Sequence, residues 1–308
     1  MAAGGGLPAA AVCGSMALPA AAAPSETPGH FRYCLNFATL QGYRSGLVEM
    51  IEVSAKAGYQ SIEPWVNGIH SYADAGGSLP DLRKRIADLG LTVESAIAFP
   101  QWIVDDPAKR AAGMEQLKRD MEVVAAIGGK RIAAPPAGAN TAAEISLLEI
   151  ARRYRAVLEL GDQMGLVPEL EFWGSSSNLR QLAQAVFAAI EANHPKACVL
   201  ADVFHLYKGE SGFTGLPLLG SQALQVIHLN DYPAAPPRET ITDRDRVYPG
   251  DGVAPMKQIL SDLHRINPSL VLSLELFNPA YWKSSPLETA RTGLAKMKQA
   301  ANAAIGTA

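Results

Sequence analysis

The feature that most constrains this chain is an alternation between short apolar runs and amphipathic helical patterns. Amphipathic stretches at residues 46–58, 79–90, 106–129 and 147–165 each end at a glycine, as helices often do. Apolar runs of strand length accompany them, at residues 32–38, 61–65, 92–99, 131–136, 167–173, 197–203, 226–231 and 270–276. Eight strand-then-helix units in about 275 residues predict an α/β fold with a single domain, the (β/α)8 or TIM barrel.

A doubly wound open sheet is the competing fold for such an alternation. That fold usually has fewer strands, and a glycine-rich phosphate-binding turn follows its first strand. Here the first apolar run is followed by "TLQGYRSG", which lacks the G-x-G-x-x-G pattern. The closed barrel is therefore favoured. Because no linker divides the chain, we expect residues 30–308 to form one domain.

Polar residues stand at the ends of the last four apolar runs. Glu171, Asp202 and Glu275 end the fifth, sixth and eighth runs, and His228 lies within the seventh. In a parallel barrel these ends meet at one mouth, where chemistry gathers. Burying three carboxylates beside an imidazole is costly without compensation, and one divalent cation is the simplest compensation. Three oxygen donors and one nitrogen suit Mn²⁺, Mg²⁺ or Co²⁺, and Mn²⁺ is our first expectation.

Each of these residues also has an ordinary structural interpretation. A glutamate at a strand end is commonly a salt-bridge or helix-cap partner, and a strand histidine is often a satisfied core residue. Four such residues on four successive strands are harder to explain in this way. Glu169 shares the side-chain face of Glu171 by the two-residue period of a strand, so we expect it one layer deeper, as a supporting group or an alternative ligand.

The order of these residues resembles the xylose isomerase-like barrel superfamily. The resemblance rests on Glu171, on "DxxH" from Asp202 to His205, on "HxxD" from His228 to Asp231, and on Glu275; "GYQSIEPW" and "PGDG" also match. The group includes sugar isomerases and epimerases, and its more distant endonuclease IV branch. The resemblance implies that Glu171, Asp202, His228 and Glu275 bind one divalent metal. It also implies that Glu171 and Glu275 exchange a proton with a substrate carbon through a metal-stabilised enediolate.

Four further residues are candidates for binding substrate. By the resemblance, His205 contacts substrate oxygens, although a histidine at a helix start can be purely structural. Arg246, in "RVYPGDG", is the best loop cation for a substrate hydroxyl or carboxylate. Glu63 and His70 follow the second run and could reach across the mouth, but Glu63 could equally be a buried ion-pair partner.

The four tryptophans form a separate signal. Trp65, Trp102, Trp173 and Trp282 all fall at or just beyond the ends of apolar runs. Aromatic faces stack on the apolar faces of sugar rings and wall a pocket against water. The sequence therefore predicts a carbohydrate-sized pocket lined by these residues.

These signals favour a divalent-metal-dependent sugar or keto-sugar isomerase or epimerase. A lyase or dehydratase acting on a keto-inositol or a 3-keto-glycoside needs the same metal and base, so the sequence leaves that alternative open. A non-catalytic sugar-binding barrel is a third hypothesis. An endonuclease IV-like nuclease needs more histidines than the six present, and the net charge of −3 disfavours binding a nucleic-acid backbone.

Residues 1–29 differ in composition from the rest of the chain. They are rich in Ala, Gly and Pro and have no charged side chain before Glu26. They resemble the apolar region and small-residue cleavage site of a secretory signal, without its basic leading region. We expect either a signal, which would make the protein exported or periplasmic, or a disordered tail on a cytoplasmic protein. No apolar run approaches membrane-spanning length, and a homo-oligomer is left open.

Overall fold

The computed structural model describes residues 1–2 and 30–306, so nearly all of the signal-like segment lies outside the described residues. The predicted apolar runs form parallel strands: β1 (Arg32–Asn36), β2 (Ser61–Glu63), β3 (Thr92–Val93), β4 (Arg131–Ala134), β5 (Val167–Glu171), β6 (Val199–Asp202), β7 (Leu224–Leu229) and β8 (Val271–Leu274). Most strand residues are buried, as expected for a parallel sheet covered on both faces. Each predicted run contains one strand or most of it.

The strands form one sheet in the order β3-β2-β1-β8-β7-β6-β5-β4. The first and last strands are neighbours, with Tyr33 opposite Leu272. At the two ends of the sheet, the Ala133 amide donates to the Ala96 carbonyl oxygen at 2.9 Å, just beyond β3. The sheet therefore curls until its ends meet, which confirms the predicted (β/α)8 barrel.

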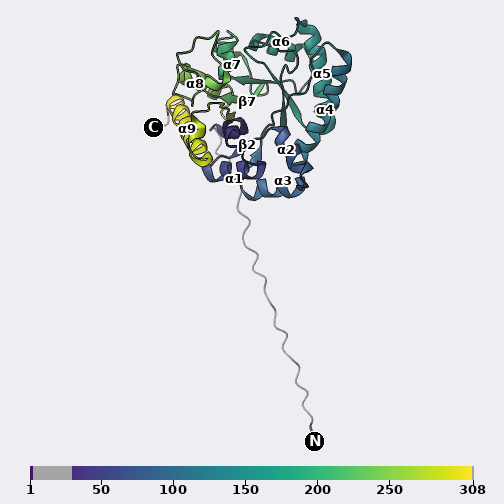
Figure 1. The fold of residues 1–308 in the computed structure, drawn as a ribbon, viewed down its shortest axis with the longest axis vertical. Helices are drawn as coiled ribbons and strands as arrows, with labels where there is room; N and C mark the ends of the chain where they lie inside the picture. Colours follow the sequence, from purple (N-terminus) through teal and green to yellow (C-terminus); the bar gives the residue numbers. More distant parts are fainter. Residues whose placement is uncertain (3–29, 307–308) are drawn as a thin grey trace.

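Helices surround the sheet, as Figure 1 shows. The α-helices are α1 (Leu47–Ala57), α2 (Val66–Asp74), α3 (Leu79–Asp88), α4 (Pro107–Ala126), α5 (Leu147–Met164), α6 (Leu182–Glu191), α7 (Val203–Lys208), α8 (Met256–Ile266) and α9 (Pro286–Ile305). The short 3-10 helices are η1 (Phe37–Tyr43), η2 (Leu216–Leu218), η3 (Asp243–Asp245) and η4 (Tyr281–Lys283). Ser78, Asp106, Ser146 and Ser285 cap the N-termini of four helices with their side chains, which fixes where these helices begin. Among the described residues, no helix is long and apolar enough to cross a membrane.

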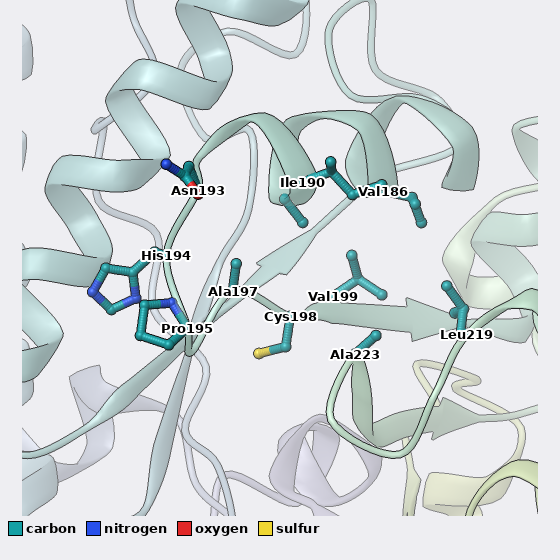
Figure 2. A pocket seen from close by; sticks show the side chains of 11 residues that line it. Val186, Ile190, Asn193, His194, Pro195, Ala197, Cys198, Val199, Leu219 and Ala223 are labelled. Carbon is teal, nitrogen blue, oxygen red and sulfur yellow. The ribbon is translucent and has the colours of Figure 1, made fainter.

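The connection between β6 and β7 departs from the regular pattern. Its α-helix, α7, has six residues, whereas α5 has 18. Beside it, between the C-terminal part of α6 and the segments leading into β6 and β7, lies a groove of about 510 Å³ (Figure 2). The groove is lined mainly by apolar side chains and contains no residue predicted for the functional site.

The N-terminal end of the barrel interior is closed by an ion network around one carboxylate. Glu94, whose side chain is 1% exposed, pairs with Lys130 at 2.8 Å, with Arg131 at 3.2 Å and with Arg32. Burial opposes the charge of Glu94, but the hydrogen bond from Lys130 and the charges of Arg32 and Lys130 outweigh it and lower the pKa to about 2. This end is therefore stabilised by opposite charges.

Candidate active site

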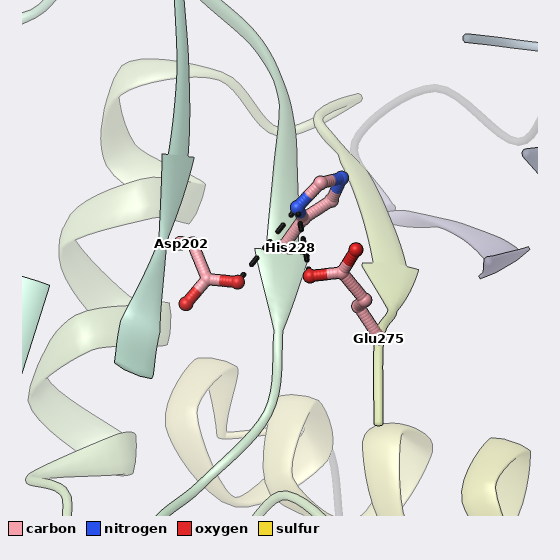
Figure 3. A group of neighbouring side chains, drawn as sticks. All are labelled: Asp202, His228 and Glu275. Atoms are coloured by element: carbon pink, nitrogen blue, oxygen red, sulfur yellow. Dashed lines mark ion pairs between the residues drawn. The ribbon is translucent and has the colours of Figure 1, made fainter. Parts of the chain in front are cut away.

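Three side chains from neighbouring strands converge at the opposite end of the barrel. Asp202 ends β6 and lies opposite His228 on β7, while Glu275 directly follows β8. Nδ1 of His228 is 3.2 Å from Oε2 of Glu275 and 3.7 Å from Oδ2 of Asp202. Figure 3 shows the two carboxylates pointing at this one nitrogen from either side. The parallel register places the three groups together because equivalent strand ends meet at the same height.

Glu171, at the end of β5, completes the set expected from the sequence. Its Oε1 lies 3.9 Å from the same Nδ1 of His228. All four side chains are buried. Nδ1 of His228 has no hydrogen-bond partner among the described residues, although it is surrounded by carboxylates. A buried polar atom without a partner calls for an explanation.

The other nitrogen of His228 contacts Glu63. Nε2 is 3.1 Å from Oε2 of Glu63, which is fully buried at the end of β2. The same Glu63 oxygen accepts hydrogen bonds from Ser273 and Asn36. Glu63 was predicted as a substrate-binding residue that could equally be a buried ion-pair partner, and the structure places it in contact with His228.

Arg246 reaches the cluster from the loop that follows β7. Its Nη1 donates to Oδ2 of Asp202 at 2.9 Å and to Oε2 of Glu275 at 2.8 Å. The guanidinium is 1% exposed and lies over the rings of Phe204 and Phe277, 4.7 and 5.2 Å from their centroids. The residue expected to be a loop cation is therefore held within the carboxylate cluster and is not a solvated surface charge.

The loop that carries Arg246 is tied to α7. Nζ of Lys208 donates to the carbonyl oxygens of Arg238, Glu239 and Ile241 at 2.7, 3.1 and 2.9 Å. One ammonium group thus satisfies three loop carbonyls, which fixes the path of the chain toward Arg246.

His205 lies on α7 next to Arg246. Its amide donates to Oδ1 of Asp202 at 2.8 Å, so Asp202 caps this helix with one oxygen and faces the cluster with the other. Nε2 of His205 is 3.3 Å from Nη2 of Arg246. Burial, reinforced by the charge of Arg246 and opposed by that of Asp202, lowers the pKa of His205, which favours the neutral ring. The structure thus brings His205 to the edge of the cluster.

Burial and charge give the two outer glutamates different proton affinities. Burial and the charges of Glu275 and Asp202 raise the pKa of Glu171 to about 8, against the attraction of His228. Burial also opposes ionisation of Glu275, but His228 and Arg246 outweigh it and lower its pKa to about 2. Burial alone would lower the pKa of His228, yet the charges of Glu275 and Glu63 hold it well above the ordinary value. Carboxyl groups outnumber cationic groups at this end of the barrel, where Glu63, Glu171, Asp202 and Glu275 surround His228 and Arg246.

The donor set fits a divalent cation. Asp202, His228 and Glu275 each offer one ligand atom, and these atoms all lie within 4.8 Å of one another. Glu171 adds a carboxylate beside the same nitrogen. Carboxylate oxygens with one imidazole nitrogen are ligands of divalent metals, and a cation would compensate the excess carboxylates and give Nδ1 a partner.

Two of the four tryptophans belong to an aromatic group next to the cluster. The ring centroid of Trp65 lies 5.1 Å from that of Phe99 and 6.3 Å from that of Phe277. The ring centroid of Trp173 lies 6.1 Å from that of Phe99. Phe99 is 45% exposed, so this group has an open face. Aromatic residues of this kind can wall a pocket for a sugar.

The other two tryptophans are placed differently. Trp102 is fully buried and donates its indole N–H to the carbonyl oxygen of Pro135. Trp282 packs over Gly42, where a β-carbon would overlap its ring, and donates to the carbonyl oxygen of Thr39. Their contacts are those of core and loop packing.

His70 is not brought to the cluster. It lies on α2, and its Nε2 is 2.8 Å from Oδ1 of Asp120 on α4, so it faces a neighbouring helix. A period-based assignment of residues 61–65 to a strand could not show that the chain turns into a helix at Val66.

Sequence reasoning missed four residues around the cluster, namely Asn36, Ser273, Phe99 and Phe277. Asn36 is the last residue of β1. Phe99 follows β3, and Phe277 lies two residues after Glu275 at the end of β8. The strand-end criterion that selected the acidic residues would therefore have found these three. Ser273 lies inside β8 opposite His228, and only the register reveals it.

The fold and the cluster define a class: a (β/α)8 barrel whose last four strands offer three carboxylates and one imidazole to a shared point. The family model for the xylose isomerase-like TIM barrel matches residues 51–300. The chain belongs to the xylose isomerase-like TIM barrel family.

Individual relatives agree with this assignment. The inosose isomerase of Bacillus velezensis is 27% identical over 273 residues, which cover 85% of this chain and 94% of that protein. Alignments with the inosose isomerases of Bacillus licheniformis and Bacillus subtilis span 65% and 64% of those proteins. A crystal structure of IolI protein with a bound zinc atom shares the fold, with a TM-score of 0.81 and 24% identity over 88% of this chain and 98% of that one. An L-ribulose 3-epimerase also shares it, with a TM-score of 0.71 and 20% identity over 89% and 96% of the two chains.

Proposed function

We propose that this protein is a divalent-metal-dependent isomerase or epimerase of a sugar or keto-sugar. The observation that carries the proposal is the environment of His228: its Nδ1 is buried, has no hydrogen-bond partner among the described residues, and faces Glu171, Asp202 and Glu275. These four residues would hold the cation. Mn²⁺ is the first candidate because the set is rich in oxygen, with Mg²⁺ and Co²⁺ as alternatives. A bound cation supplies Lewis acidity, which lowers the pKa of a C–H group next to a substrate carbonyl.

Glu171 and Glu275 are the proposed proton-transfer residues. They approach His228 from β5 and β8, on either side of β6 and β7, so a substrate between them would meet one carboxyl group on each side. One would remove a proton from carbon, and the other would return it.

Arg246 and His205 are the proposed contacts for substrate oxygens. They lie side by side at the edge of the cluster, and a neutral His205 can either donate or accept a hydrogen bond. Trp65 and Trp173, with Phe99 between them, would cover the apolar face of a sugar ring.

Inososes are the first substrates to test, because the Bacillus velezensis relative aligned along 94% of its length is an inosose isomerase. An export signal in residues 1–29, which remains a prediction, would also favour unphosphorylated sugars.

Proton exchange with solvent tests the proposal directly. Protein loaded with Mn²⁺ is incubated in D₂O with inososes, free ketoses and 3-keto-glucosides. We expect deuterium to enter one substrate at carbon without loss of any group, to stop after chelation, and to resume when the metal is restored. Release of water or of an aglycone would instead assign the lyase reaction. Absence of exchange with every compound, or exchange that a chelator does not affect, would contradict the proposal.

A further inference from the structure

The contact between His228 and Glu63 has a chemical consequence for the proposed metal site. Both side chains are fully buried, and Nε2 of His228 lies 3.1 Å from Oε2 of Glu63. A carboxylate can only accept hydrogen bonds, so Nε2 must carry a proton in this contact. When the ring is neutral, Nδ1 is then the nitrogen with a free lone pair. That nitrogen faces Glu171, Asp202 and Glu275.

Glu63 is itself held firmly in place. Its Oε2 accepts hydrogen bonds from Oγ of Ser273 at 2.6 Å and from Nδ2 of Asn36 at 2.9 Å, in addition to the contact with His228. The four residues come from β1, β2, β7 and β8. Because these strands belong to one hydrogen-bonded sheet, the carboxylate has little freedom to turn away from the ring.

Asn36 extends this arrangement to the other side of the cluster. Its Nδ2 also donates to Oε1 of Glu275 at 3.2 Å, while its Oδ1 accepts from the amide of Ala38 and the indole of Trp65. The two acceptor contacts fix which end of the amide is the donor. Asn36 therefore ties Glu63 to a proposed ligand, Glu275, and to the aromatic group.

We propose that Glu63 is a positioning residue for the metal site: it holds His228 in the tautomer and orientation that direct Nδ1 at the three carboxylates. The inference rests on the proposed function, since it takes His228 as a ligand. A carboxylate that accepts the N–H of a metal-bound histidine orients the ring and makes the other nitrogen, which binds the metal, more basic. Glu63 acts through His228 and does not touch substrate.

The inference is tested with Glu63→Gln in the full-length protein. Glutamine keeps the size of the side chain but can turn an N–H₂ group toward Nε2, which would leave the proton on Nδ1. Zn²⁺ is titrated against a chromophoric chelator, and Co²⁺ is titrated while its d–d absorption is recorded. We expect the Zn²⁺ Kd to rise about 10- to 100-fold and the Co²⁺ band to change. A Kd within about twofold of the wild type, with an unchanged band, would overturn the inference.

Glu94→Gln is the matched control. Glu94 is also a buried glutamate, but its charged partners are Arg32, Lys130 and Arg131 at the N-terminal end of the barrel, and it does not contact His228. We expect wild-type Zn²⁺ affinity in this variant. An equal loss in Glu94→Gln would show that loss of a buried charge, and not loss of the contact with His228, lowers the affinity, and the inference would fail.

Ser273→Ala provides a second variant in case Glu63→Gln does not fold. It removes one donor to Oε2 of Glu63, so we expect a smaller rise in Kd with the same change in the Co²⁺ band. Wild-type affinity and spectrum in Ser273→Ala would then overturn the inference. If the wild-type protein binds neither cation, the proposed function fails as well, whereas tight wild-type binding with unaltered variants overturns only the role of Glu63.

Discussion

The two ends of the barrel interior carry charged clusters with opposite ratios of carboxyl groups to cations. At the N-terminal end, the single carboxylate of Glu94 is surrounded by Arg32, Lys130 and Arg131. At the C-terminal end, four carboxylates share one guanidinium and one imidazole, and Nδ1 of His228 is left without a hydrogen bond among the described residues. The first cluster has three cations for one carboxylate, whereas the second has more carboxyl groups than cationic groups.

This difference separates a charged cluster that stabilises the fold from one whose carboxylates are available to bind a cation. Removing a buried carboxylate from its cationic partners destabilises the folded state, since it leaves those charges without compensation. A buried cluster with excess carboxylates is costly unless something else binds there. In a (β/α)8 barrel the two roles fall at the two ends, with stability at the N-terminal face and chemistry at the C-terminal face. Two substitutions and a pH series can test that division.

The largest expected effect is loss of turnover in Glu275→Gln. The change removes a proposed ligand and proton-transfer group, so the rate of deuterium exchange should fall at least about 1,000-fold. Circular dichroism should show that the fold persists. Near-normal exchange in this variant would contradict the proposed catalytic role of Glu275. It would also remove the evidence that the C-terminal cluster serves chemistry.

At the other end, Glu94→Gln should lower stability and leave catalysis intact. Three cations lose their shared partner, and because Lys130 is partly exposed we expect a loss of about 2 kcal/mol in the free energy of unfolding. Urea denaturation measures the loss, and exchange activity per folded molecule should match that of the wild type. A stable Glu94→Gln protein without activity would reverse the assignment of the two ends.

A pH series sharpens the same contrast with a smaller effect. Glu94 has its pKa lowered from 4.5 to about 2 in the folded protein. A carboxyl group with a lowered folded-state pKa adds stability above its unfolded-state pKa and loses it as the pH falls toward the folded-state value. Wild-type stability should therefore decline between about pH 5 and pH 2 more steeply than that of Glu94→Gln, as measured by urea midpoints. Parallel pH curves for the two proteins would contradict the prediction.

The fold was predictable because the alternation of apolar runs and helical patterns is a local property of the chain. The convergence of Glu171, Asp202, His228 and Glu275 also followed, since parallel strands bring their ends to one mouth. Their role as metal ligands stays a prediction. The position of these four residues at or near strand ends was enough to place them at the same mouth of the barrel.

Contacts across the barrel were not predictable from the same pattern. The meeting of Glu63 with His228 depends on side-chain length and on the register of four strands, and the approach of Arg246 depends on the path of a loop. His70 and Trp102 show the converse problem: both follow strands closely, yet one faces a helix and the other enters the core. Where the chain leaves a strand, the period of two no longer determines which way a side chain points.

The interruption of the strand ladder between β3 and β4 bears on how such a barrel can be redesigned. Among the described residues, β3 and β4 contribute no member of the carboxylate cluster or of the network around Glu63. Loops grafted after these two strands would reshape the rim while the proposed metal ligands and the network around Glu63 stay on the remaining six strands. New substrate specificity is therefore easiest to engineer in the loops that follow β3 and β4.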